Sequence, residues 1–129
     1  MAVETPFKEC TCCSASWESL SAFVLDPELT LEGYQPSFAN PFEGWLLLTH
    51  DTPGCRTTLA VKTAHLRDLY DGPDYAERRT GTPGCPLLCI RENRLEECTM
   101  DCDMAWVRQV MQYLRRHTLP PRLVTEEAQ

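Results

Sequence analysis

Alternating apolar and polar residues in the first half of the chain predict a small sheet. Residues 29–34 alternate with the period of two that is typical of a half-buried strand, and residues 45–50 and 57–61 have the same character. The last two segments are joined by a turn at residues 51–56, so we expect them to pair as antiparallel neighbours. The pattern therefore predicts an antiparallel sheet of about three strands.

Helical spacing of apolar residues predicts one helix before this sheet and a short one after it. The first helix has Ser14 or Ser16 as its cap and ends at Pro27. Its apolar stripe consists of Trp17, Leu20, Phe23 and Val24. The second helix, at residues 64–70, is expected to be capped by Thr63.

The clearest helical pattern lies near the carboxyl end. Apolar residues recur there at helical spacing, at Val107, Val110, Met111 and Leu114. Asp103 is the predicted cap, and the Pro120–Pro121 pair ends the helix. The chain is therefore predicted to be an α+β protein in which an N-terminal, a short middle and a C-terminal helix pack against the sheet. Residues 1–123 are expected to form a single cysteine-rich domain, with a disordered tail at 124–129.

The length and composition of the chain indicate that its irregular loops are held by cross-links. The chain has 129 residues, enough for one domain with a modest core. Ten prolines and the stretches at residues 35–44 and 71–103 leave much of it irregular. Ordering such loops costs conformational entropy, so we expect metal or disulfides to hold them.

Eight cysteines could supply these cross-links, and they form two groups of four. The first group is Cys10, Cys12, Cys13 and Cys55, and the second is Cys85, Cys89, Cys98 and Cys102. Four thiolates complete one tetrahedral zinc site, so the count predicts two sites, or one site and a cluster of reactive thiols. Zinc is the expected cofactor. An iron–sulfur cluster is the alternative, although the spacings differ from those of ferredoxins.

The second group consists of two cysteine pairs, each with three intervening residues, separated by eight residues. Such spacings are within the range of zinc pairs, and a separation of four positions places both sulfurs on one face of a helical turn. Disulfides are the alternative for this group. They are less expected in a chain without an export signal.

The first group depends on Cys55 returning from the sheet to meet the amino-terminal cysteines. Cys55 ends a Thr-Pro-Gly-Cys motif that recurs at Cys85, so the same type of turn delivers one cysteine to each group. Adjacent Cys12 and Cys13 point in different directions in an extended chain, so one of them could ligate while the other stays free. His50 is a substitute nitrogen ligand, although a hydrogen bond from its ring to a carbonyl is the preferred interpretation.

Charge and targeting signals narrow the class of protein. Twelve Lys and Arg against nineteen Asp and Glu give a net charge of −7, which argues against nucleic-acid binding. A basic run near the carboxyl end is interpreted as a solvated helix face. It comprises Arg108, Arg115, Arg116, His117 and Arg122. Because the first thirteen residues do not resemble a signal peptide and no apolar run is long enough to cross a bilayer, we expect a soluble, cytoplasmic protein without membrane contact.

The predicted function is that of a binding or regulatory module with structural zinc and a protein partner, rather than an enzyme. A thiol-dependent redox enzyme is the competing class. Its nucleophile would be Cys12 or Cys13 near a helix amino terminus, with His50 as the base. An iron–sulfur electron carrier is the third class.

Overall fold

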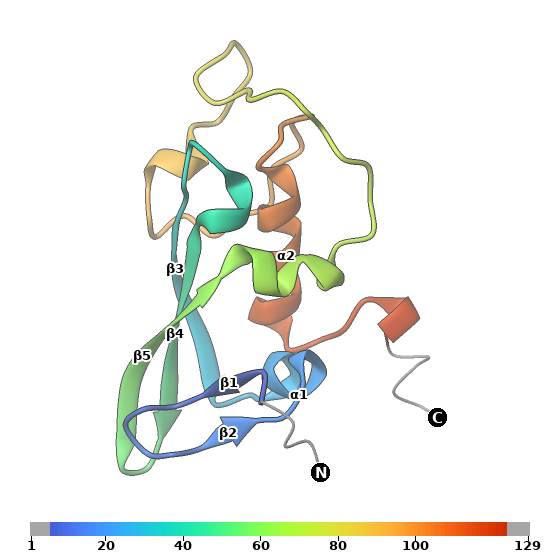
Figure 1. Ribbon diagram of the computed structural model, residues 1–129. Coiled ribbons are helices and arrows are strands. Elements are labelled where there is room, and N and C mark those ends of the chain that lie inside the picture. Colours follow the sequence, from blue (N-terminus) through green and yellow to red (C-terminus); the bar gives the residue numbers. More distant parts are fainter. Residues whose placement is uncertain (1–5, 124–129) are drawn as a thin grey trace.

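The computed structural model describes residues 6–123 and shows a mixed α+β fold (Figure 1). Its centre is a three-stranded antiparallel sheet with the strand order β3–β4–β5. The strands are β3 (Leu29–Gln35), β4 (Trp45–Thr52) and β5 (Cys55–Lys62). The predicted sheet is therefore confirmed, with strands slightly longer than the sequence pattern indicated.

The register of the sheet decides which side chains face the core. β4 and β5 pair without interruption, ending with Thr52 opposite Cys55. Alternation buries three residues on each strand. These are Leu46, Leu48 and His50 in β4, and Cys55, Leu59 and Val61 in β5. His50 and Cys55 therefore lie on the same, core-facing side of this hairpin.

A two-stranded sheet precedes the main one. β1 (Lys8–Glu9) pairs antiparallel with β2 (Ser16–Trp17). The predicted helix start, with Ser14 or Ser16 as the cap, is therefore wrong. Residues 16 and 17 are extended because they pair with β1.

The helix α1 spans Leu20–Leu25. Ser19 caps it, since its Oγ accepts a hydrogen bond of 3.1 Å from the N–H of Ala22. Trp17 lies outside the helix, but its indole packs edge-on against Phe23, with ring centroids 5.2 Å apart. The apolar stripe of the sequence thus forms one packed cluster that spans two elements.

The predicted middle helix is a 3-10 helix, η2 (Thr63–Leu69). Thr63 is its first residue rather than its cap, and the Thr63 hydroxyl donates a hydrogen bond of 2.6 Å to the carbonyl of Pro41. Pro41 begins η1 (Pro41–Glu43), a single turn within the predicted loop at 35–44. This bond ties the start of η2 to the connection between β3 and β4.

The predicted closing helix is α2 (Ala105–Arg116). Met104 occupies its cap position. Asp103, the predicted cap, instead forms an ion pair with Arg78. The helix begins later than predicted because this arginine, 25 positions earlier, holds the carboxylate.

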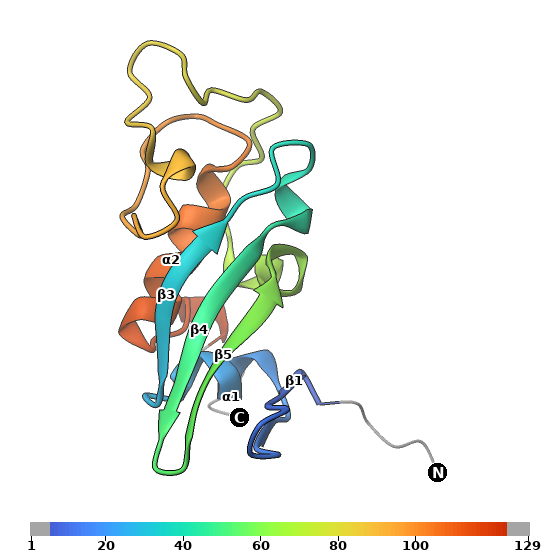
Figure 2. The same ribbon diagram turned by 90° about the vertical axis from the view of Figure 1, so that its left-hand side faces the viewer.

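The helices cover one face of the main sheet, and the chain between η2 and α2 extends beyond one end of it (Figures 1 and 2). Within the described part of the chain, that connection contains one helical turn, η3 (Leu88–Ile90), and no strand. The hairpin turn between β4 and β5 lies at the opposite end of the molecule (Figure 1). The predicted tail at 124–129 lies outside the described residues.

Candidate metal centre

Four metal-ligand side chains converge where the amino-terminal segment meets the tip of the β4–β5 hairpin. They are Cys10, Cys13, His50 and Cys55, and one donor atom from each lies within 4.8 Å of all the others. The sulfurs of Cys10 and Cys55 are 3.7 Å apart, and the sulfur of Cys13 is 3.6 Å from Nδ1 of His50.

These distances can be compared with the edges of a zinc tetrahedron. Zinc–sulfur bonds of about 2.3 Å and zinc–nitrogen bonds of about 2.0–2.1 Å give edges of roughly 3.8 Å between two sulfurs and roughly 3.6 Å between sulfur and nitrogen. The observed 3.7 and 3.6 Å match both edges. The arrangement is therefore suited to a tetrahedral ion held by three sulfurs and one nitrogen.

A tight turn between β1 and β2 supplies two of the sulfurs. The N–H of Ser14 donates to the carbonyl of Cys10 at 3.0 Å, and the N–H of Cys10 donates to the carbonyl of Ala15 at 2.7 Å. Ser14 has a left-handed φ of 67°, which reverses the chain. The turn directs Cys10 and Cys13 toward the hairpin, while the side chain of Cys12 is exposed and outside the group of four.

The hairpin supplies the other two ligands. Cys55 begins β5 directly after the Pro53–Gly54 turn, in which Gly54 has a φ of 87°. The recurrence of this motif is structural as well, because Gly84 before Cys85 has a φ of 89°. His50 reaches the site from the same face of the sheet as Leu48, as strand periodicity requires.

Backbone donors prepare some of these thiols for ionisation. The pKa of Cys55 is lowered to about 7, chiefly by the N–H of Thr57 and, against an opposing effect of burial, by the neighbouring thiols. The pKa of Cys10 is also lowered, chiefly by the N–H of Cys13 and, against burial, by the ring of His50. The N–H of Ala15 lowers the pKa of Cys13, but burial and the sulfurs of Cys10 and Cys55 outweigh it and raise the pKa overall.

The surroundings of His50 hold its ring in place. The indole of Trp17 packs edge-on against the imidazole, with centroids 5.0 Å apart, and Nε1 of Trp17 donates to Asp26 at 2.8 Å. Carboxylate oxygens of Asp26 and Glu28 also lie within 4.8 Å of a ring nitrogen of His50. Carboxylates beside a ligating histidine commonly orient it and increase its basicity.

The sequence expectations fare differently at this site. The structure brings Cys55 to Cys10 and Cys13, as the first group requires, but replaces Cys12 by His50. The sequence favoured a hydrogen bond from His50 to a carbonyl over metal ligation. In the structure Nδ1 of His50 lies 3.6 Å from the sulfur of Cys13, within the group of four possible ligands. A usable signal was present, because Cys10 and Cys13 have two intervening residues, the commonest zinc-pair spacing, and grouping cysteines by fours obscured it.

The second cysteine group lies elsewhere. Within residues 6–123 its sulfurs do not form a group with donor atoms inside 4.8 Å of one another. They line one small cavity beside the start of α2, together with Met100 and Arg108. All eight cysteines of the chain are free thiols in the structure.

No protein-family model, no curated protein and no solved structure matches this chain. Among the described residues, no helix is both long and apolar enough to cross a membrane. The chemistry of the molecule must therefore be inferred from its own side chains.

Proposed function

We propose that the protein binds one zinc ion through Cys10, Cys13, His50 and Cys55, and that this zinc is structural in a module that binds a protein partner. The observation that carries the proposal is the match between the two measured donor separations and the edges of a zinc tetrahedron. Three of the four ligand residues are buried, and only Cys13 is exposed.

The donor set favours zinc over the other metals considered. Three thiolates and one imidazole form a common closed zinc site, whereas ferredoxin clusters are held by four thiolates. Catalytic zinc keeps one position for water, but here four protein donor atoms already lie within 4.8 Å of one another. The expected role is therefore structural.

A structural ion at this position would link the short strands β1 and β2 to the longer strands β4 and β5. β1 and β2 have two residues each, too few for a stable independent hairpin. Zinc would join the turn between them to the tip of the long β4–β5 hairpin. Since a site of this kind forms only in the folded state, its binding energy is also folding energy.

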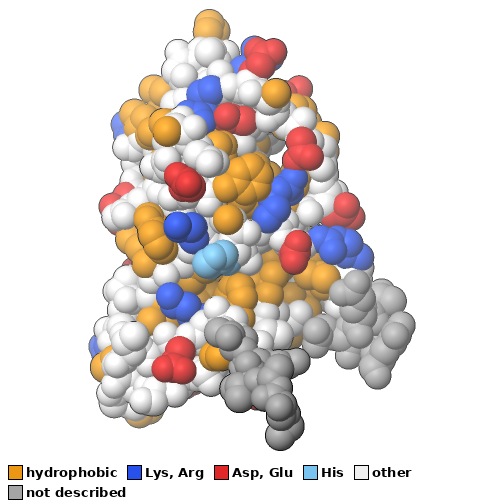
Figure 3. Space-filling model, viewed as in Figure 1, with side chains coloured by type: hydrophobic (Ala, Val, Ile, Leu, Met, Phe, Trp, Pro, Cys, Tyr) orange, Lys and Arg blue, Asp and Glu red, His pale blue; other side chains and the backbone are white. Residues whose placement is uncertain are grey.

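A groove of about 350 Å³ beside η1 and η2 supports the role of binding module. Figure 3 shows hydrophobic side chains gathered in a hollow beside basic and acidic ones at this level of the molecule. The groove lining includes Phe42, Trp106, Tyr75 and Arg67. Aromatic residues and arginine are enriched where proteins bind other proteins.

A thiol-dependent redox function is the second candidate, because Cys12 and Cys13 are both exposed and the pKa of nearby Cys10 is lowered. The two functions differ in how the thiols react. Structural zinc protects Cys10 and Cys13 from alkylation until a chelator removes the metal. A redox enzyme reacts rapidly at Cys12 or Cys13 in its resting state.

The test is metal analysis of the full chain purified without added metal, followed by X-ray absorption at the zinc edge. The expected first shell at this site has three sulfurs at about 2.3 Å and one nitrogen at about 2.0–2.1 Å. Replacement by Co²⁺ should give the visible d–d bands of a tetrahedral thiolate site. Brown protein containing iron and sulfide, or metal-free protein with rapid single-site alkylation at Cys12 or Cys13, would overturn the proposal.

A further inference from the structure

The second cysteine group surrounds one cavity at the opposite end of the molecule from the first site. Cys85, Cys89, Cys98 and Cys102 all line this cavity, whose volume is about 10 Å³. That is close to the minimum space for a single water-sized occupant. The non-cysteine lining is largely apolar, including Leu88, Met100 and Met104, and so offers few hydrogen bonds to a water molecule.

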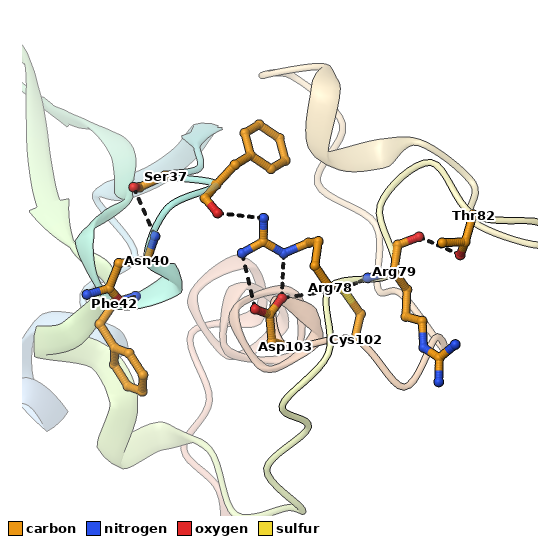
Figure 4. A network of polar contacts seen from close by, with 9 residues as sticks. Ser37, Asn40, Phe42, Arg78, Arg79, Thr82, Cys102 and Asp103 are labelled. Carbon is orange, nitrogen blue, oxygen red and sulfur yellow. Dashed lines mark hydrogen bonds and ion pairs between the residues drawn. The ribbon is translucent and has the colours of Figure 1, made fainter.

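Backbone N–H groups point at two of these sulfurs. The N–H of Arg79 donates to Sγ of Cys102 at 3.2 Å, and Figure 4 shows this contact next to the start of α2. The N–H of Leu87 donates to Sγ of Cys85 at 3.4 Å. Leu87 adopts a left-handed φ of 59°, which is uncommon for leucine. Hydrogen bonds to sulfur stabilise its anionic form, the form that binds metal.

A buried cation lies in the same cavity wall. Arg108 is 0% exposed, and its Nη1 donates to the carbonyls of Arg94 at 2.7 Å and Glu96 at 3.1 Å. Its Nε and Nη2 atoms have no hydrogen-bond partner among residues 6–123. Within the described residues, no carboxylate forms an ion pair with Arg108. A buried charge without a counter-charge is costly, so an anion is expected beside it.

We propose that the four thiolates of the second group bind a second zinc ion, and that Arg108 balances the charge of this centre. Four thiolates and one Zn²⁺ carry a net charge of −2, and the guanidinium offsets half of it. The ion would fill the cavity and draw the sulfurs together. No oxidation or group transfer is involved, because four thiols release protons as the metal binds.

This centre explains how the long connection before α2 keeps its shape. The segment at 79–104 contains only η3 as regular structure. It contacts α2 through hydrogen bonds from Arg108 and Gln112 to carbonyls of residues 94–96. One ion bound by both cysteine pairs would close the loop between them and join it to the amino terminus of α2. The four thiols share one cavity with a guanidinium that forms no ion pair among the described residues. This arrangement supports a metal site more specifically than the cysteine spacing does.

The experiment measures zinc stoichiometry of the full chain and the ¹¹³Cd spectrum of the cadmium-substituted protein. The wild type should bind two ions per chain and give two resonances, one typical of four sulfurs and one of three sulfurs with nitrogen. Cys98→Ser should lose the four-sulfur resonance and keep the other. Cys10→Ser should show the reverse, so that failure of either site is distinguishable from failure of the other.

Arg108 has its own test. Arg108→Gln keeps a polar side chain but removes the charge, and should weaken the second ion by about 10–100-fold while leaving the first unchanged. Competition with a chromophoric chelator measures both affinities. A wild type that binds one ion only, or that shows disulfides among the four cysteines after purification under reducing conditions, would overturn the second site. Equal affinities in wild type and Arg108→Gln would overturn the role of the arginine.

Discussion

Arg108 and Tyr34 face each other between α2 and β3, with the guanidinium carbon 5.6 Å from the centroid of the phenol ring. Both side chains are buried, and the hydroxyl of Tyr34 has no hydrogen-bond partner among the described residues. Burial raises the pKa of Tyr34 well above its usual range. The face of the phenol ring attracts the guanidinium, but the hydroxyl makes no hydrogen bond to Arg108.

Replacing Tyr34 by Phe is therefore expected to leave the free energy of unfolding unchanged or raise it by up to about 1 kcal/mol. The substitution removes a buried polar atom and keeps the ring that faces Arg108. Tyr70 offers a matched control, because its hydroxyl donates to the carbonyl of Pro73 at 2.7 Å. Tyr70→Phe should lower the free energy of unfolding by about 1 kcal/mol.

Urea unfolding of the three proteins under identical metal conditions measures both changes. A clear loss of stability in Tyr34→Phe, equal to that in Tyr70→Phe, would show that the buried hydroxyl has a partner after all.

The first metal centre predicts different outcomes for neighbouring cysteines. Cys55→Ser should weaken zinc binding at this centre by more than about 100-fold, because it removes a direct ligand, and should destabilise the fold accordingly. Cys12→Ser should retain both the metal and the stability of the wild type, since Cys12 is exposed and outside the group of four. His50→Gln should behave like Cys55→Ser. Equal losses in Cys12→Ser and Cys55→Ser, measured by chelator competition, would contradict the assignment of ligands.

The sheet was predictable because strand periodicity and burial agree along β4 and β5, and along β3 as far as the bulge between Leu31 and Gly33. The same periodicity predicts the orientation of His50. This residue shares its face of β4 with Leu46 and Leu48, so its side chain points toward the core. The two-residue spacing between Cys10 and Cys13 favours Cys13 over Cys12 as the second ligand, and in the structure a left-handed turn at Ser14 follows Cys13, whose sulfur joins the group of four.

Long-range partners account for the other differences. Asp103 is of a residue type that commonly caps helices and precedes the apolar pattern of α2, but its carboxylate forms an ion pair with Arg78 instead. The sequence predicts that Arg108 belongs to a solvated basic run, and for this residue the prediction is wrong because Arg108 is fully buried. Its burial depends on carbonyls at Arg94 and Glu96 and on the cysteine cavity, none of which helix spacing reveals.

The hydrogen bonds of Arg78 give a stability prediction that involves no change to a proposed metal ligand. Arg78 donates to Asp103 through Nε at 2.5 Å and Nη2 at 3.1 Å, and to the carbonyl of Phe38 at 2.7 Å (Figure 4). Its side chain is 24% exposed. Arg78→Ala should lower the free energy of unfolding by about 1.5–3 kcal/mol, since it removes charge-assisted bonds and leaves Asp103 without its partner.

Arg79 is the control for this prediction. Its side chain is 44% exposed and lies 3.7 Å from Glu77, a surface pair that contributes little. Arg79→Ala keeps the backbone N–H that contacts Cys102, and should change stability by no more than about 0.5 kcal/mol. Similar urea midpoints for Arg78→Ala and Arg79→Ala would refute the structural role of the Arg78 hydrogen bonds.

Alkaline pH should destabilise the protein through Tyr34. Its pKa in the folded state is raised above the ordinary value of 10.0 by burial, so the folded state keeps a proton that the unfolded state releases. The stability associated with this group is fully present below pH 10 and is lost as the pH rises above it. Tyr34→Phe removes this dependence. The difference in free energy of unfolding between Tyr34→Phe and wild type should therefore grow in favour of the variant above pH 10, as measured by urea unfolding at neutral and alkaline pH, and a difference that stays constant would contradict a neutral, buried phenol.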